Sequence, residues 1–153
     1  ARSSLIDYNK RLAEGNAVFE RRADNLLATL DRIALDIGSS TATIDKHIDE
    51  NAGAFIDFQA DNIFYGVKGQ SYGYYMLLKA LAQDYEGLIK ERGLTNAWAQ
   101  MLASFKSVID LDPFIVVNAT PDSQFLPNHL AAQAFYVLRA RTQLQEISNI
   151  LLK

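Results

Sequence analysis

The chain has 153 residues, 49% of them hydrophobic and 22% charged, which suits a globular domain with its own core. Its net charge of -3 excludes the basic field that nucleic-acid-binding proteins use, and gives little attraction to an anionic membrane surface. Cysteine is absent, which excludes disulfides, thiolate metal sites and a cysteine nucleophile. No apolar run is long enough, at about 18 residues, to span a bilayer.

Residues 4–37 are predicted to form one long helix, because apolar residues recur there in steps of three and four. A helix of this length measures about 50 Å, more than the diameter of such a globule. We therefore expect one end to protrude, either as an overhang or as an arm that forms a homodimer. Gly15 predicts a bend, and Gly38 predicts the end of the helix. The apolar positions are Leu5, Tyr8, Leu12, Phe19, Ala23, Leu26, Leu30, Ile33 and Ile37.

A shorter helix is predicted for residues 41–50, and the sequence Asn-Ala-Gly at 51–53 is expected to end or kink it. Residues 54–65 fit either a helix or partly irregular structure. Gly66 and Gly69 predict a loop. A further helix is expected from about residue 70 to 92, followed by Gly93 as a cap.

The next predicted helix begins at Thr95 or Asn96, and Pro113 excludes its continuation. Residues 114–117 are a short apolar run with no second strand to pair with, so we expect a buried extended connector that crosses the bundle. The last helix is predicted for residues 128–153, with Asn128 as its cap. The inner face of the helix that follows Thr95 is expected to comprise Trp98, Met101, Leu102, Phe105, Val108 and Ile109.

The predicted fold class is all-α: a bundle of about five helices, with a long N-terminal helix and an extended connector before the C-terminal helix. No repeat, low-complexity tract or long linker divides the chain, so residues 1–153 are predicted to form one helical domain. Because the helical pattern starts almost at Ala1, we expect the natural chain to extend upstream. A membrane anchor is one candidate for that segment, and this domain would then be the soluble part of a longer protein.

Arg141 is the one charged residue on the apolar face of the last helix. A guanidinium buried without a carboxylate or several carbonyls costs several kcal/mol, on the order of the penalty for any unpaired buried charge. Three readings follow: a structural ion pair or a side chain that reaches solvent, an anion-binding site, and a catalytic group. The candidate partners for an ion pair are Asp57, Asp61 and Asp84.

Other ligand-binding candidates are polar or aromatic residues near Arg141 or near the glycines. His129 and Gln133 form a small polar cluster with Asn128, although a histidine in a first turn is typical of a surface or capping residue. Tyr65 and Tyr72 lie beside the glycines and would line a pocket, although such tyrosines are more typical of core edges. The candidate set is Arg141, His129, Gln133, Tyr65 and Tyr72.

No catalytic residue, cofactor or metal is predicted. His47 lies in a polar helical stretch, and no Glu-x-x-His pair, phosphate-binding loop or nucleophile turn is present. The cluster around His129 is the only feature that favours an enzyme.

Four strings carry a family resemblance: residues 98–101, 112–118, 125–130 and 135–141. With them the chain resembles an uncharacterised bacterial family, domain of unknown function twenty-three thirty-three, over roughly residues 55–153. The resemblance implies a protein of Gram-negative bacteria, with an N-terminal membrane helix ahead of a soluble part. It implies no activity, cofactor or catalytic residue.

Two functions are therefore expected. The first is a bacterial envelope protein at the inner membrane, whose periplasmic helical domain is a scaffold or interaction module with an unidentified protein partner, and forms a homodimer through the first helix. The alternative is a sensor or binding module for a small anionic ligand, which would use Arg141 and the Tyr/Gly-rich loop.

Overall fold

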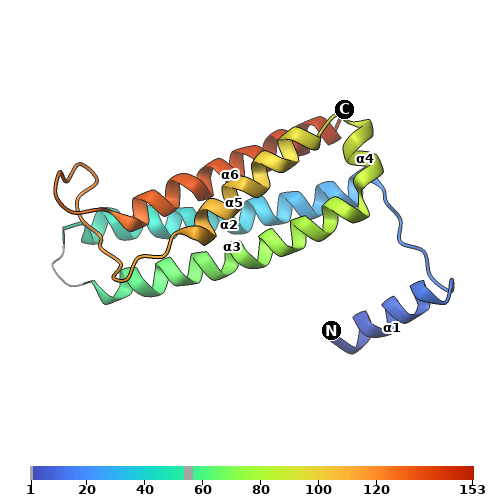
Figure 1. The fold of residues 1–153 in the computed structure, drawn as a ribbon, viewed down its shortest axis with the longest axis horizontal. Coiled ribbons are helices and arrows are strands. Elements are labelled where there is room, and N and C mark those ends of the chain that lie inside the picture. The colour runs from blue at the N-terminus through green and yellow to red at the C-terminus, as the bar shows by residue number, and fades with distance from the viewer. Residues whose placement is uncertain (1, 54–56) are drawn as a thin grey trace.

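Helices make up nearly all of the regular structure in the computed structural model, which describes residues 2–53 and 57–153 (Figure 1). Within these ranges there is no β-strand, and one isolated bridge joins Asn118 to Asn128. The predicted all-α class is therefore confirmed. The helices are α1 (Arg2–Ala13), α2 (Ala23–Asn51), α3 (Phe58–Asp84), α4 (Glu86–Glu91), α5 (Thr95–Asp110) and α6 (His129–Leu151).

The four long helices α2, α3, α5 and α6 form a bundle (Figure 1). Helix α6 packs mainly on α2 and α5, and α3 packs mainly on α5. Each helix turns its apolar stripe inward, because burial of this stripe stabilises a helix more than its intrinsic propensity does. Among the wholly buried side chains are Leu30, Phe64, Met101, Phe105 and Leu144.

The single long helix predicted for residues 4–37 is wrong. Helix α1 ends at Ala13, and Gly15 has a φ of +74°, in the left-handed region that favours glycine. The chain then runs without helix to Ala23, where α2 begins. The apolar steps are interrupted at Gly15 and Asn16 and resume at Phe19 in the same register, so the pattern was compatible with a bent helix.

The predicted helix end at Gly38 is also wrong, because α2 continues through this residue to Asn51 and absorbs the helix predicted for residues 41–50. Gly38 instead allows the Arg141 side chain to pack closely against α2. A Cβ atom at this position would lie 3.1 Å from Cζ of Arg141, which reaches across from α6. The glycine therefore makes room for a neighbouring side chain.

The loop predicted at Gly66 and Gly69 is wrong, because α3 runs through both glycines without a break. Both lie on the exposed face of α3, while Phe64 and Val67 on its other face are buried. Burial of that face outweighs the weak helix propensity of glycine. In the ambiguous stretch of residues 54–65, the helix starts at Phe58, and residues 54–56 lie outside the described part of the chain.

The helix predicted for residues 70–92 is divided in two. Helix α3 ends at Asp84, and α4 follows after Tyr85, whose ring is buried. The predicted stop at Gly93 is confirmed, because this residue has a φ of +66° directly after the cap Arg92.

The connector before α6 differs from its prediction. Phe114 is fully exposed and Ile115 is 67% exposed, whereas Val116 is buried. A buried path would have to displace the helical side chains that already fill the core. The connector therefore runs over the outside of the bundle, and the predicted burial holds only for its second half.

Two hydrogen bonds hold the start of this connector on α3. Nζ of Lys68 donates to the Leu111 carbonyl at 2.7 Å, and the Tyr65 hydroxyl donates to the Pro113 carbonyl at 3.1 Å. The Leu111 carbonyl directly follows α5, where helical partners run out, and Pro113 lies two residues further on. The bonds therefore decide the side of the bundle on which the connector leaves α5.

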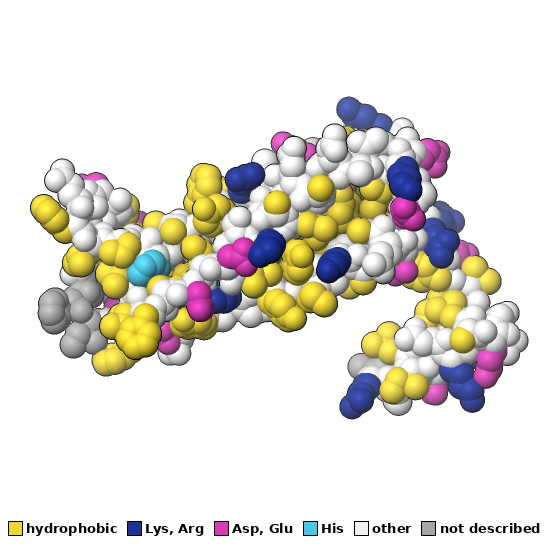
Figure 2. Space-filling model, in the orientation of Figure 1, with side chains coloured by type: hydrophobic (Ala, Val, Ile, Leu, Met, Phe, Trp, Pro, Cys, Tyr) yellow, Lys and Arg dark blue, Asp and Glu magenta, His cyan; other side chains and the backbone are white. Residues whose placement is uncertain are grey.

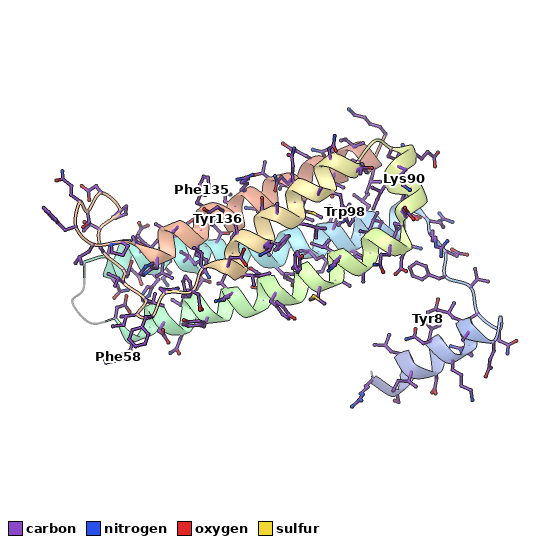
Figure 3. All side chains as sticks on the ribbon, viewed as in Figure 1. Tyr8, Phe58, Lys90, Trp98, Phe135 and Tyr136 are labelled. Carbon is purple, nitrogen blue, oxygen red and sulfur yellow. The ribbon has the colours of Figure 1, made fainter. Side chains whose placement is uncertain are left out.

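Helices α5 and α6 agree well with the sequence. Trp98, Met101, Phe105 and Val108 are buried as predicted, and Leu102 and Ile109 are partly exposed. Trp98 lies beneath the α4 end of the bundle, as Figure 3 shows. Asn128 caps α6, where its side-chain oxygen accepts from the Ala131 amide at 2.7 Å.

Helix α1 stands away from the bundle and has no buried residue (Figure 1). Figure 2 shows hydrophobic side chains on its surface. Leu5 and Ile6 of this helix are more than half exposed. The segment that follows is held by Phe19, whose ring packs edge-on against Tyr85 with 5.7 Å between centroids. Among the helices described, none is both long and apolar enough to cross a membrane.

Candidate functional site

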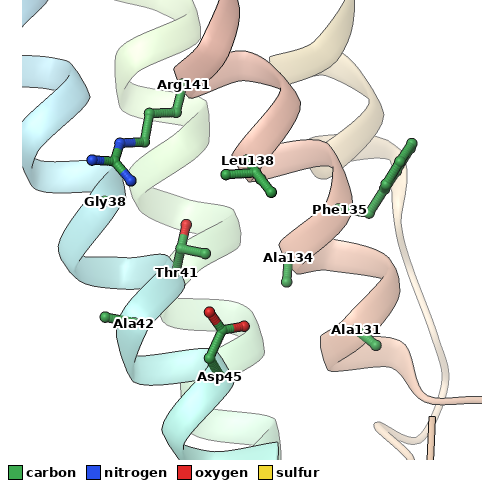
Figure 4. A pocket seen from close by; sticks show the side chains of 9 residues that line it. All are labelled: Gly38, Thr41, Ala42, Asp45, Ala131, Ala134, Phe135, Leu138 and Arg141. Carbon is green, nitrogen blue, oxygen red and sulfur yellow. The ribbon is translucent and has the colours of Figure 1, made fainter.

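A groove runs along the outer surface between α2 and α6 (Figure 4). Small residues form its floor and let the two helices approach closely, and Phe135 and Leu138 rise beside it. Its volume is about 340 Å³, and a second hollow of about 470 Å³ shares Asp45, Ala131 and Ala134 and continues it. Its lining comprises Gly38, Thr41, Ala42, Asp45, Ala131, Ala134, Phe135, Leu138 and Arg141.

The lining follows from helical spacing. On α2, positions 38, 41, 42 and 45 share one face, and on α6 positions 131, 134, 138 and 141 do the same. The sequence places glycine, alanine or threonine at most of these positions, so the floor is low. Phe135 is 61% exposed and Leu138 50% exposed, so the ridge is apolar and open to solvent.

Arg141 lies at one end of the groove, with its guanidinium against Gly38 (Figure 4). Its side chain is partly exposed, and its Nε atom is buried without a hydrogen-bond partner. No carboxylate of the described residues pairs with it. The ion-pair alternative is therefore wrong, because Asp57 binds His47 instead, and Asp61 and Asp84 are exposed. The partly exposed side chain fits the other structural alternative, in which Arg141 reaches solvent.

The groove has charges of opposite sign at separate places. Arg141 lies level with Gly38, whereas Asp45 lies seven residues further along α2, about 10 Å away by the rise of a helix. Asp49 lines the continuation of the groove beyond Asp45. An elongated ligand with both charges fits this pattern better than a small anion, which the carboxylates would repel.

Replacing Gly38 with alanine measures the contact with Arg141. Alanine in a helix is favoured over glycine by about 1 kcal/mol. The added Cβ would lie 3.1 Å from Cζ of Arg141, so the guanidinium must shift and part of this gain should be lost. In thermal unfolding we expect G38A to stabilise less than the matched variant G66A, whose added Cβ meets no atom within 4 Å. Equal stabilisation would contradict the contact.

His129 and Gln133 serve the α6 start and the core. Nδ1 of His129 accepts from the Val117 amide at 2.9 Å, and burial lowers the pKa of this histidine. Gln133 is wholly buried, and its Nε2 donates to the Phe64 carbonyl at 2.9 Å. Gln133 therefore faces α3 while Arg141 faces α2, and the structure does not bring these two candidates together.

Tyr65 and Tyr72 lie on α3, and both are exposed. Tyr65 holds the connector through the Pro113 carbonyl, and neither tyrosine lines the groove. The loop that was expected to carry an aromatic pocket beside the glycines is helix.

The sequence did not predict a buried polar network at the C-terminal end of α2. Nε2 of His47 lies 2.7 Å from Oδ2 of Asp57, and Asn118 donates to the same oxygen at 3.0 Å. Oδ1 of Asp57 accepts from the Ala60 amide, and Asn128 donates to Asn118. We call His47, Asp57, Asn118 and Asn128 the Asp57 network. It joins the ends of α2, α3 and α6 to the connector.

The electrostatics of this network favour an ionised carboxylate. Burial alone would raise the pKa of Asp57, but the hydrogen bonds from Asn118 and His47 outweigh it and hold this pKa below its ordinary value. Every oxygen of the carboxylate is already bonded within the chain. The Asp57 network is therefore a structural joint, and it offers no free acceptor to a ligand.

One signal for it was present. His47 lies three residues after Ile44 and continues the inward steps of α2 through Ile33 and Ile37.

In residues 2–53 and 57–153, no three side chains of the metal-ligating types gather closely enough to hold an ion. The groove beside Arg141 is thus the candidate site.

Comparison with known families gives one match. The model of DUF2333, described as an uncharacterised protein conserved in bacteria, matches residues 55–153. No curated protein and no solved structure shows significant similarity to the chain.

Proposed function

The chain belongs to the DUF2333 family of bacterial proteins, as the sequence resemblance predicted. For this member of the family we propose that the helical domain is a protein-interaction module. The binding surface would be the groove between α2 and α6. The observation that carries the proposal is the uncovered ridge of Phe135 and Leu138 beside a floor of small residues. Figure 3 shows Phe135 pointing away from the bundle.

Such a surface suits a partner that inserts apolar side chains between two helices. Low floors built from glycine and alanine accept large side chains, and exposed aromatic residues dominate the energy of many interfaces. The two charges would fix the orientation of the bound partner, because Arg141 would pair with a carboxylate of the partner and Asp45 with a cationic group.

Photocrosslinking in the bacterium tests this proposal. Benzoylphenylalanine in place of Phe135 or Leu138 in the full-length protein is expected to form defined protein adducts on illumination. The matched control carries the same group in place of Tyr72, which is similarly exposed on α3. Absence of adducts at the groove, or equal adducts at the control position, would contradict the proposal.

A second candidate function is the binding of a small anion. One observation favours it: Arg141 lines an open groove and forms no ion pair with any described residue. Asp45 in the same groove opposes it. If it is correct, phosphate, sulfate or succinate should raise the melting temperature of the wild-type chain and not that of R141M. An equal response of both proteins, or none, would exclude this function.

For the location, we propose the bacterial inner membrane, with this domain on the periplasmic side. The support is the N-terminal membrane helix that the family resemblance implies. The full-length protein is then expected in the inner-membrane fraction, and protease added to spheroplasts should digest residues 1–153. Complete protection of this domain in intact spheroplasts would place it on the cytoplasmic side.

A further inference from the structure

Helix α1 differs from the rest of the chain in charge. Residues 2–13 hold three basic side chains and one acidic side chain, a net charge of +2, so the remaining residues carry -5 of the chain's total of -3. The total therefore combines a basic helix with an acidic remainder. Only the structure separates the two, because the sequence predicted one helix across both.

The side chains of α1 sort into an apolar face and a polar one. Leu5, Tyr8 and Leu12 lie three and four residues apart, so they share one side of the helix, which we call the apolar face of α1. At 3.6 residues per turn, Arg2 and Arg11 lie at the two borders of this face. The helix is therefore amphipathic, with a cation on either side of its apolar face.

The bundle leaves this helix uncovered. No residue of α1 is buried, Leu5 is 63% exposed, and the helix stands apart in Figure 2. The Tyr8 hydroxyl donates to the Val18 carbonyl at 3.1 Å, which brings a further exposed apolar residue beside α1. A helix of 12 residues is only marginally stable in water by itself, so α1 needs a surface on which to pack.

We propose that α1 lies on the surface of an anionic membrane, with its apolar face toward the acyl chains and with Arg2 and Arg11 at the lipid phosphates. Helices with an apolar face and basic borders bind in this way, because arginine reaches the headgroups while its stem stays in apolar surroundings. Tyrosine favours the same depth, since its ring is apolar and its hydroxyl polar. Anionic lipids offer phosphates on both sides of an embedded helix, whereas a protein groove would need a carboxylate at each border.

The segment after α1 keeps the acidic bundle away from such a surface. Phe19 packs against Tyr85, and residues 14–18 separate it from the end of α1. When extended, these five residues span about 16 Å, which is twice the screening length of about 8 Å at physiological ionic strength. Repulsion between the bundle and the lipids is then largely screened. The inference goes beyond the interaction function of the groove and does not depend on it.

Flotation of the purified chain with lipid vesicles tests the proposal. Wild type is expected to float with vesicles of phosphatidylglycerol and phosphatidylcholine in equal parts, and to stay behind with pure phosphatidylcholine. R2E combined with R11E should weaken binding roughly tenfold or more, because two attractions of about fivefold each become repulsions. L5S combined with L12S should also weaken it, although the charge is unchanged, because less apolar surface enters the lipid.

The matched control is K79E combined with R139E, which lowers the net charge equally at exposed positions of the bundle. It should bind as wild type does, since only α1 touches the lipid. All α1 variants should keep the melting temperature of wild type, because no residue of α1 is buried. A wild type that does not bind anionic vesicles, equal binding to neutral vesicles, or an equal loss in the control would overturn the proposal.

Spin labels then locate the bound helix. The chain has no cysteine, so L5C and D7C each provide one attachment site, on opposite sides of α1. With anionic vesicles, the label at position 5 is expected to collide with oxygen, which concentrates in lipid, and the label at position 7 with a water-soluble nickel complex. Equal exposure of both labels to nickel would show that another part of the chain binds the vesicles, which contradicts the proposal.

One outcome would give the helix a different partner. A dimer in sedimentation equilibrium without lipid, lost in L5S combined with L12S, would assign the apolar face to a second copy, as the sequence predicted, and would overturn the lipid contact. The photocrosslinking and spheroplast experiments do not depend on vesicle binding. Failure of this proposal would therefore leave the interaction function and the location standing.

Discussion

Replacing Asp57 with alanine is expected to lower the free energy of unfolding by about 3 kcal/mol. The change removes the cap on the Ala60 amide and leaves His47 and Asn118 buried without their shared acceptor. Loss of a helix cap costs about 1 kcal/mol, and a buried polar group left unpaired costs about 1–3 kcal/mol. Urea unfolding followed by circular dichroism measures this loss.

The control for Asp57 is Asp61, which lies in the same turn of α3 and is exposed. D61A should change stability by no more than about 0.5 kcal/mol. A similar loss in both variants would show that the charge near the helix start matters, and not the Asp57 network.

The pH dependence gives a second readout for the same group. Because the pKa of Asp57 is lowered in the folded chain, its contribution is complete above the ordinary carboxyl pKa of 3.8 and is lost as the pH falls through the folded pKa. D57N should lack this loss in acid. The slope of stability against pH below about pH 4 should therefore be smaller in D57N than in wild type.

Replacing Trp98 with alanine is expected to cost about 4 kcal/mol, the usual range for deleting a buried aromatic ring. Trp98 is almost fully buried and packs where α4, α5 and the end of α3 meet, beside Ile89 and Leu102. Its Nε1–H is buried and makes no hydrogen bond within the described residues. Packing, and not polar contact, therefore explains its contribution.

The matched variant is W98F, which keeps most of the ring and removes the unpaired N–H. Its loss should be about 1 kcal/mol or less, because the volume changes little and an unsatisfied donor disappears. Chemical unfolding followed by far-ultraviolet circular dichroism compares the three proteins, since the chain has no other tryptophan. Equal losses in W98A and W98F would show that the hydrogen-bonding group matters more than packing.

The candidate site was visible in the sequence only in part. Arg141 stood out, because a charge on an apolar stripe is unusual, and the structure places it in the groove. The other side of the groove could not be predicted. From its neighbours in the sequence Gly38 indicates a helix end, whereas in the folded chain it lies inside α2 against Arg141. The pairing of His47 with Asp57 could not be predicted for a similar reason, because it joins α2 to the cap of α3.

The sequence by itself determined the helical class, the inner face of α5, the stop at Gly93 and the cap at Asn128. These features depend on residue spacing or on one local backbone conformation, which neighbours in the chain specify. Only the tertiary structure decided where α2 begins, that α3 passes through Gly66 and Gly69, and that the connector stays outside. In α3, burial against the other helices outweighs the poor helix propensity of glycine, about 1 kcal/mol per residue. The helical side chains that fill the core leave no room for the connector. Residue spacing reports local preferences and neither of these effects.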